Sequence, residues 1–119
     1  MSSIAKGSRY EREAEHYLCE RGLRLVARNV RCRLGEIDLV MEDERTLVFV
    51  EVRFRRSSHY GSPLQSVTAR KRERIIKAAL WFLGRSSKHR DQACRFDAVG
   101  ITGEDGALRI DWIKDAFSA

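Results

Sequence analysis

Apolar residues recur at helical spacing in two segments of the chain. Residues 4–21 carry one apolar stripe, which ends at a helix-stopping Gly22 and consists of Tyr10, Ala14, Tyr17 and Leu18. Residues 66–83 carry a second stripe, which ends at Gly84 and consists of Ile75, Ile76, Ala79, Phe82 and Leu83. The spacing therefore predicts two amphipathic helices.

Five shorter runs are typical of β-strands. Residues 35–41 and 47–54 are the strongest, with a polar Glu-Asp-Glu-Arg turn between them, and residues 23–29 form a weaker run before them. Residues 94–101 and 108–113 follow the second helix and are joined by a Gly-Glu-Asp-Gly turn.

The predicted elements follow the order α-β-β-β-α-β-β. A loop at residues 55–65, with the turn residues Gly61, Ser62 and Pro63, leads into the second helix. Three antiparallel strands and a helical crossover to further strands predict an α/β fold with a mixed central sheet flanked by helices. Residues 1–119 fit one domain, because a hydrophobic content of 43% suffices for a single core.

Two kinds of location are disfavoured by the sequence. No run of 18 apolar residues is present, so no membrane span and no membrane partner are expected. The first residues lack the apolar stretch and cleavage site of a signal peptide, which predicts a cytoplasmic protein.

Cysteines and histidines give no sign of a metal or redox centre. Three cysteines, without a Cys-x-x-Cys pair, are interpreted as small buried hydrophobes: Cys19, Cys32 and Cys94. Three histidines lack metal-ligand spacing and are expected on the surface: His16, His59 and His89. Three large aromatic residues are expected to cover core edges rather than to stack on nucleic-acid bases: Trp81, Trp112 and Phe117.

Positive charge is concentrated in one part of the chain. The net charge is +6, yet residues 53–95 contain twelve basic and two acidic residues, so this stretch carries +10 and the remainder −4. Such asymmetry favours a polyanionic partner, most simply nucleic acid, although a solubilising surface gives the same composition.

The run at residues 47–54 places charges where a buried strand is expected. Both of its faces begin apolar, which predicts a central strand covered on both sides. Glu51 and Arg53 follow on one face, where an unpaired charge is costly. The two residues either form a mutual ion pair or belong to a site.

The preceding strand adds carboxylates to the same region. Glu36 and Asp38 share one face, with Ile37, Leu39 and Met41 on the other. A hairpin loop of two or four residues would place Asp38 across from Glu51 or one diagonal step away. Converging carboxylates repel each other, but they suit a hard divalent cation such as Mg²⁺ or Mn²⁺.

The quoted segments resemble a known family. GEIDLV, a short turn and LVFVEVR are similar to the core of the PD-(D/E)xK nucleases, which include restriction endonucleases and Holliday-junction resolvases. The closer resemblance is to the YraN family of small bacterial proteins. It is carried by YEREAEHYL, RNVRCRLGEIDLV, LVFVEVRFR, YGSPLQSVTARKRERI, RFDAVGI and WIKDAF, which span nearly the whole chain.

The resemblance implies roles for individual residues. Asp38 and Glu51 would be metal-binding carboxylates, and Glu11 matches an additional acid of resolvase-like members. Ser8-x-x-Glu11 also spells a capping box, and Glu13 borders the same apolar face, so the residues alone do not decide. Glu36 is either a further metal ligand or a solvated strand start.

Arg53 departs from the superfamily pattern, in which lysine is usual. Arginine stays protonated, so it can stabilise negative charge but cannot act as a general base. Asp97, another strand carboxylate, is expected to pair structurally with a nearby arginine rather than to bind metal.

Further residues are predicted to contact nucleic acid. Cations in the first half of the second helix oppose the helix dipole, so a bound phosphate backbone explains them better than helix stability does, with a solvated face as the alternative. The predicted contacts are Arg55, Arg56, Gln65, Arg70, Lys71, Arg72 and Arg74.

Three functions are consistent with these observations. The first is a magnesium-dependent phosphodiesterase acting on DNA, including branched repair intermediates, with Asp38, Glu51 and Arg53 as catalytic residues. The second is a DNA-binding module that has kept the fold without strong catalysis. The third is a protein–protein adaptor whose buried charges are ion pairs, and a homodimer contact through the WIKDAF tail is compatible with each.

Overall fold

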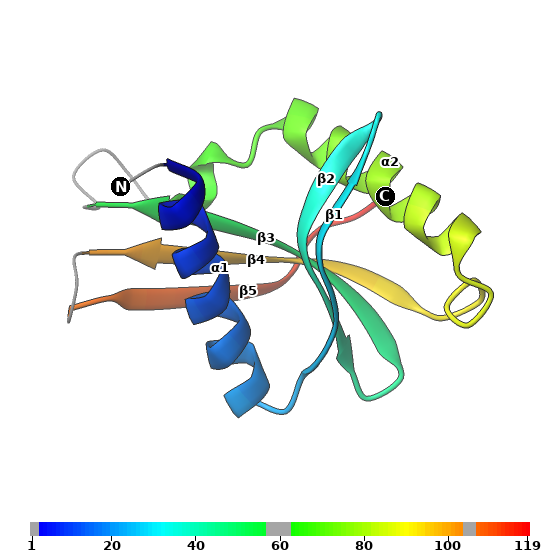
Figure 1. The fold of residues 1–119 in the computed structure, drawn as a ribbon, viewed down its shortest axis with the longest axis horizontal. Coiled ribbons are helices and arrows are strands. Elements are labelled where there is room, and N and C mark those ends of the chain that lie inside the picture. The colour runs from blue at the N-terminus through cyan, green and yellow to red at the C-terminus, as the bar shows by residue number, and fades with distance from the viewer. Residues whose placement is uncertain (1–2, 57–62, 104–106) are drawn as a thin grey trace.

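The computed structural model describes residues 3–56, 63–103 and 107–119 (Figure 1). Its elements are α1 (Ser3–Glu20), β1 (Arg24–Cys32), β2 (Gly35–Asp43), β3 (Thr46–Arg55), a short 3₁₀ helix η1 (Pro63–Ser66), α2 (Ala69–Arg85), β4 (Cys94–Thr102) and β5 (Arg109–Phe117). This order confirms the α-β-β-β-α-β-β prediction. The predicted turn residues Gly61 and Ser62, and His59, lie outside the described residues.

The strands form one mixed five-stranded sheet in the order β1-β2-β3-β4-β5. β3 and β4 are parallel, and the other neighbouring pairs are antiparallel. The parallel pair is connected through α2, as a crossover requires. Figure 1 shows α1 crossing one face of the sheet and α2 on the other.

The central strand β3 is covered on both faces, as its sequence predicts. Val48 and Val50 are buried in the cluster that packs against α1, whose buried residues are Tyr10, Ala14 and Leu18. Leu47 and Phe49 are buried in the cluster that packs against α2, whose buried residues are Ile75, Ala78 and Ala79. Glu51 and Arg53 continue the face that α2 covers.

The alternation of β2 breaks beside Asp38. Leu39 and Met41 pack on the α1 side, but Ile37 packs on the α2 side with Val40, so its expected face was wrong. The cause lies in β1, where Asn29 faces this position with a left-handed backbone of φ 51°. The outer half of the β1–β2 hairpin therefore bends toward α2 (Figure 1).

Both ends of α2 differ from the prediction. Its N-cap is Thr68, whose hydroxyl accepts a 3.3 Å hydrogen bond from the N–H of Lys71, so the helix begins at Ala69 rather than Ser66. Gly84 lies within the helix, which ends at Arg85. A 3₁₀-type bond from Ser86 N–H to Leu83 O closes the last turn without a left-handed glycine.

Several predictions of which residues are buried and which are exposed were also wrong. Cys19 and Cys94 are exposed, so they are not the buried residues that were predicted, whereas Cys32 is half-buried and packs against the core cluster on the α2 side. His89 is buried because the α2–β4 connection folds back, stacks its ring on Phe82 and bonds its Nδ1 to Gln92 Oε1 at 2.7 Å.

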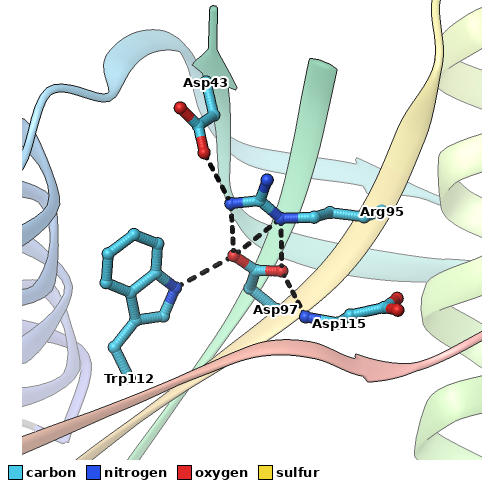
Figure 2. Close-up of polar contacts among 5 residues, drawn as sticks. All are labelled: Asp43, Arg95, Asp97, Trp112 and Asp115. Atoms are coloured by element: carbon cyan, nitrogen blue, oxygen red, sulfur yellow. Dashed lines mark hydrogen bonds and ion pairs between the residues drawn. The ribbon is translucent and has the colours of Figure 1, made fainter.

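Asp97 holds β5 against β4 (Figure 2). Its fully buried carboxylate pairs with Arg95 and also accepts hydrogen bonds from Trp112 Nε1 and the backbone N–H of Asp115, both at 2.9 Å. Asp115 has φ 53° and sits where the register between β4 and β5 shifts. The structure thus confirms the predicted pairing of Asp97 with an arginine.

The same bulge lets β5 continue to Phe117, beyond the predicted end at Ile113. Trp112 and Phe117 pack against the two core clusters, as expected. Trp81 belongs to neither cluster and remains 37% exposed, so its predicted core role was wrong.

Candidate functional site

The register of the β2–β3 hairpin brings Asp38 and Glu51 together. Asp43 pairs with Thr46, which leaves the two-residue loop Glu44–Arg45, and Leu39 pairs with Val50. Asp38 and Glu51 are the next opposed positions, and their side chains are joined by a hydrogen bond. The assumption of an even-numbered loop is confirmed, together with the approach of the two carboxyls that it implies.

Asp38 is also fixed to the backbone of the central strand. Its Oδ2 atom accepts a 2.8 Å hydrogen bond from the N–H of Val52. The side chain of a β2 residue therefore satisfies a main-chain donor of β3 at the point where the two strands part.

Glu51 has an unusual protonation state. Burial, the hydrogen bond to Asp38 and the negative charge of Asp38 raise the pKa of Glu51 to about 9, although the charges of Arg53 and Lys71 act in the opposite direction. At neutral pH the protonated form of the Glu51 carboxyl is therefore favoured.

Glu11 approaches this pair from α1. Burial and the charge of Asp38 raise the pKa of Glu11 to about 7, while a hydrogen bond from the Asn29 side chain lowers it. The helix begins at Ser3, so the capping-box interpretation of Ser8 and Glu11 was wrong. The electrostatic contact with Asp38 distinguishes Glu11 from Glu13.

The two carboxyls open into a pocket of about 330 Å³ between the hairpin and the first turns of α2. Glu36 lies at its rim, exposed and paired with Arg31 at 3.3 Å. The remaining charged side chains of the wall are cationic: Arg31, Arg53, Lys71 and Arg74. An acidic floor within a basic wall suits a ligand that carries both a cation and an anion.

Gly35 determines how closely the hairpin approaches α2. A Cβ atom at this position would lie 2.4 Å from the backbone carbonyl oxygen of Arg74. Only glycine permits this contact, which sets the width of the pocket beside Arg74.

Comparison with known proteins places this architecture in a family. The profile of the family described as "Uncharacterised protein family UPF0102" matches residues 10–101, a segment that contains the site carboxylates. The chain belongs to this family. The assignment confirms the resemblance to the YraN family.

Three UPF0102 relatives illustrate the similarity. A UPF0102 protein of Nitrosococcus oceani is 53% identical over 94% of this chain and 90% of its own length. One of Ectopseudomonas mendocina is 51% identical over 95% and 94% of the two chains. One of Serratia proteamaculans is 47% identical over 100% and 99%. The similarity therefore covers nearly the whole length of this chain.

The carboxylates of this UPF0102 protein do not form one large ligand cluster. Among residues 3–56, 63–103 and 107–119, no group of three or more His, Cys, Asp or Glu side chains is gathered to hold a metal ion. Glu11 comes from the helix on the other face of the sheet, and Glu36 is turned to Arg31. Asp38 and Glu51 could still bind Mg²⁺ without further carboxylates. This ion commonly takes only one or two carboxylate ligands and completes its shell with water and phosphate.

The predicted nucleic-acid contacts divide into two groups. Arg53, Lys71 and Arg74 line the pocket. Arg72 points elsewhere, because its Nε donates to Val67 O at 3.2 Å and its guanidinium lies 5.8 Å from the Phe117 ring.

The other predicted contacts lie outside this wall. Arg70 is exposed on α2, and Arg56 is exposed beyond β3. Arg55 ends β3 half-buried, and its Nε has no hydrogen-bond partner within the described part of the chain. Gln65 belongs to η1, and its side chain lies outside the described structure.

Two residues of the UPF0102 site were missed from the sequence. Arg31 lines the pocket, and Asn29 bonds Glu11 and bends the hairpin. An asparagine inside a strand run was the available signal for the bend, since Asn tolerates the left-handed conformation better than most residues.

The described helices include none long and apolar enough to cross a membrane.

Proposed function

We propose that this protein binds DNA and hydrolyses its phosphodiester bonds with the help of Mg²⁺ or Mn²⁺. The observation that carries the proposal is the Asp38–Glu51 pair, placed on the floor of a pocket whose other charged walls are largely cationic. The resemblance of the strand motifs to PD-(D/E)xK nucleases and resolvases supports the same reaction class.

Folding stability does not account for this pair. Burial of Glu51 disfavours its charged form, and the adjacent Asp38 carboxyl raises its pKa further. A bound cation would offset the repulsion between the two carboxylates and would favour the ionised form of Glu51. Groups kept in an unfavourable state inside a cleft are typical of functional sites.

Each residue then has a defined task. Asp38, held by the Val52 N–H, and Glu51 would supply oxygen ligands, and the cation would lower the pKa of a bound water and polarise the scissile phosphate. Glu11 and Glu36 would act from a greater distance, through the charge they add around Asp38.

The cationic wall would hold and neutralise the phosphates. Arg53 lies next to Glu51 in the wall, where its guanidinium would stabilise negative charge that develops on the phosphate. Lys71 acts on Glu51 from α2 and supplies the ammonium group that the strand lacks. Arg74 would bind a neighbouring phosphate.

One observation favours a second function. Arginine occupies the position where the nuclease superfamily has lysine, and it cannot exchange a proton at ordinary pH. A DNA-binding module with weak or absent catalysis would use the same pocket and the same cationic wall.

Branched DNA is included among the proposed substrates because of the resemblance to resolvases.

The test is cleavage of linear and branched DNA with Mg²⁺ or Mn²⁺. We expect metal-dependent cleavage by the wild type and none by Asp38→Asn or Glu51→Gln. Asp91→Asn removes one exposed carboxylate far along the chain and serves as the control, which should cleave normally.

The outcomes separate the candidates. Metal-dependent cleavage that persists in both site variants contradicts the proposed site. Salt-sensitive binding without cleavage by any form supports the binding module. Absence of both activities leaves the adaptor.

A further inference from the structure

One flank of α2 carries a regular series of exposed side chains. Arg70, Arg74, Lys77, Trp81 and Arg85 are separated by four, three, four and four residues, so they lie on one side of the helix. All five are exposed. Four cations and one indole therefore form a stripe, here called the α2 stripe, about 22 Å long at 1.5 Å per residue.

Helix stability does not explain the stripe. The first turn of α2 contains no acidic residue, and Arg70 opposes the helix dipole there, although Arg85 in the last turn favours it. Within the described residues, neither Arg70 nor Arg74 forms an ion pair. Lys77, in contrast, pairs with Glu73 at 3.1 Å.

Trp81 lies exposed in the middle of these charges. The guanidinium carbon of Arg85 lies 5.0 Å from the centre of its ring, and the side chain contributes to neither core cluster. An indole exposed among arginines is the arrangement that stacks nucleic-acid bases, since each base has a π-face and each linkage a phosphate.

The stripe meets the pocket at Arg74. Arg74 belongs to both, because it lines the pocket and its backbone touches Gly35 of the hairpin. Trp81 lies two turns further along α2, about 10 Å away at 1.5 Å per residue. A strand that places a phosphate in the pocket can therefore continue along the stripe.

We propose that the α2 stripe binds a single-stranded segment of the substrate and that a base of this segment stacks on Trp81. A duplex keeps its base faces covered by neighbouring pairs, whereas an unpaired strand exposes them. The inference rests on the proposed DNA binding and adds the substrate class: DNA with an unpaired arm next to the bond that is cleaved.

The test measures binding of single-stranded and duplex oligonucleotides of equal length without divalent ions, so that no cleavage occurs. Trp81→Leu keeps an apolar side chain but removes the ring and should weaken single-strand binding roughly tenfold, with little change for duplex. Trp81→Phe keeps a ring and should retain most of the affinity. Leu80→Ala changes the neighbouring residue, which is 64% exposed on a different side of α2, and should bind like the wild type.

Tryptophan fluorescence gives an independent readout of stacking. Single-stranded DNA should quench the emission of the wild type, and Trp81→Phe should lose this quenching. Trp112 remains in that variant as an internal reference, because its Nε1 is bonded to Asp97 inside the fold.

The outcomes distinguish this inference from the proposed function. Equal single-strand affinity of the wild type and Trp81→Leu, with salt-sensitive DNA binding retained, overturns the stacking on Trp81 alone. Failure to bind either form of DNA overturns the proposed function as well. Equal loss of affinity for single strand and duplex also overturns the single-strand assignment.

Discussion

The backbone N–H of Val52 donates a 2.8 Å hydrogen bond to Oδ2 of Asp38, across the opening between β3 and β2. This bond gives Asp38 two separate roles, since one oxygen supports the backbone while the carboxyl also contacts Glu51. Substitutions at position 38 can therefore separate stability from chemistry.

Asp38→Asn keeps an oxygen acceptor for Val52 but removes the negative charge. We expect an unchanged or higher thermal midpoint together with loss of divalent-metal binding. Asp38→Ala leaves the Val52 N–H unsatisfied and should cost about 1–3 kcal/mol of unfolding free energy. Calorimetry and thermal melts of both variants measure these effects, and an Asn variant less stable than the Ala variant would contradict the dual role.

The raised pKa values predict a definite pH dependence of stability. A carboxyl whose folded pKa lies above its unfolded value binds more protons when folded, so its contribution is fully present below pH 4.5 and is lost as pH rises. The loss extends to about pH 7 for Glu11 and to about pH 9 for Glu51. Without divalent ions, the free energy of unfolding should therefore decline across these ranges.

Chemical unfolding between pH 5 and pH 9 tests this dependence. Glu51→Gln should flatten the profile up to about pH 9, and Glu11→Gln should flatten only the part below about pH 7. Asp91→Asn, an exposed change away from the acidic pair, is the control. Parallel profiles for all four proteins would be inconsistent with the buried acidic pair.

Arg53 distinguishes catalysis from binding. Arg53→Lys keeps the positive charge and supplies a group whose pKa can shift, so a nuclease limited by arginine should cleave at the same or a higher rate. Arg53→Ala removes a charge that lowers the pKa of Glu51, so cleavage and DNA binding should both fall. The measurement pairs the metal-dependent cleavage rate with the thermal midpoint, and a lysine variant that binds and cleaves worse than the alanine variant would refute this role.

Lys71 and Arg74 line the pocket, whereas Arg72 points away from it, so their substitutions should affect different properties. Lys71→Ala and Arg74→Ala should weaken DNA binding, and each should reduce the salt dependence of log Kd by about one phosphate contact. Arg72→Ala should instead lower the thermal midpoint, because Arg72 bonds Val67 and packs near Phe117. Binding titrations at several salt concentrations test the distinction, which fails if all three variants lose the same affinity.

The Asp38–Glu51 pair could be predicted from the sequence for a physical reason. Strand side chains alternate with period two, so an even-numbered loop fixes which residues share a face. The strong apolar runs around both residues identified the strands, and the observed loop is Glu44–Arg45. Asp97 could be assigned in the same way, because a buried carboxylate requires a partner.

Features that depend on distant contacts could not be predicted. The helical period left Glu11 and Glu13 equivalent until α1 was placed against the sheet. Ile37 changed its face because Asn29, on another strand, adopts a left-handed backbone. The extension of β5 depends on the capture of the Asp115 N–H by Asp97, which no local pattern reveals.

The two-residue turn at Glu44–Arg45 also has a consequence for the order in which contacts form during folding. A hairpin forms within roughly 1–10 μs, so Asp38 and Glu51 can meet early in folding. The parallel pairing of β3 with β4 must wait for closure of the longer crossover, and Lys71 and Arg74 arrive with it. The acidic pair therefore forms with Arg53 of the same hairpin beside it and before Lys71 and Arg74 arrive, so the positive charge around it is still incomplete during that interval.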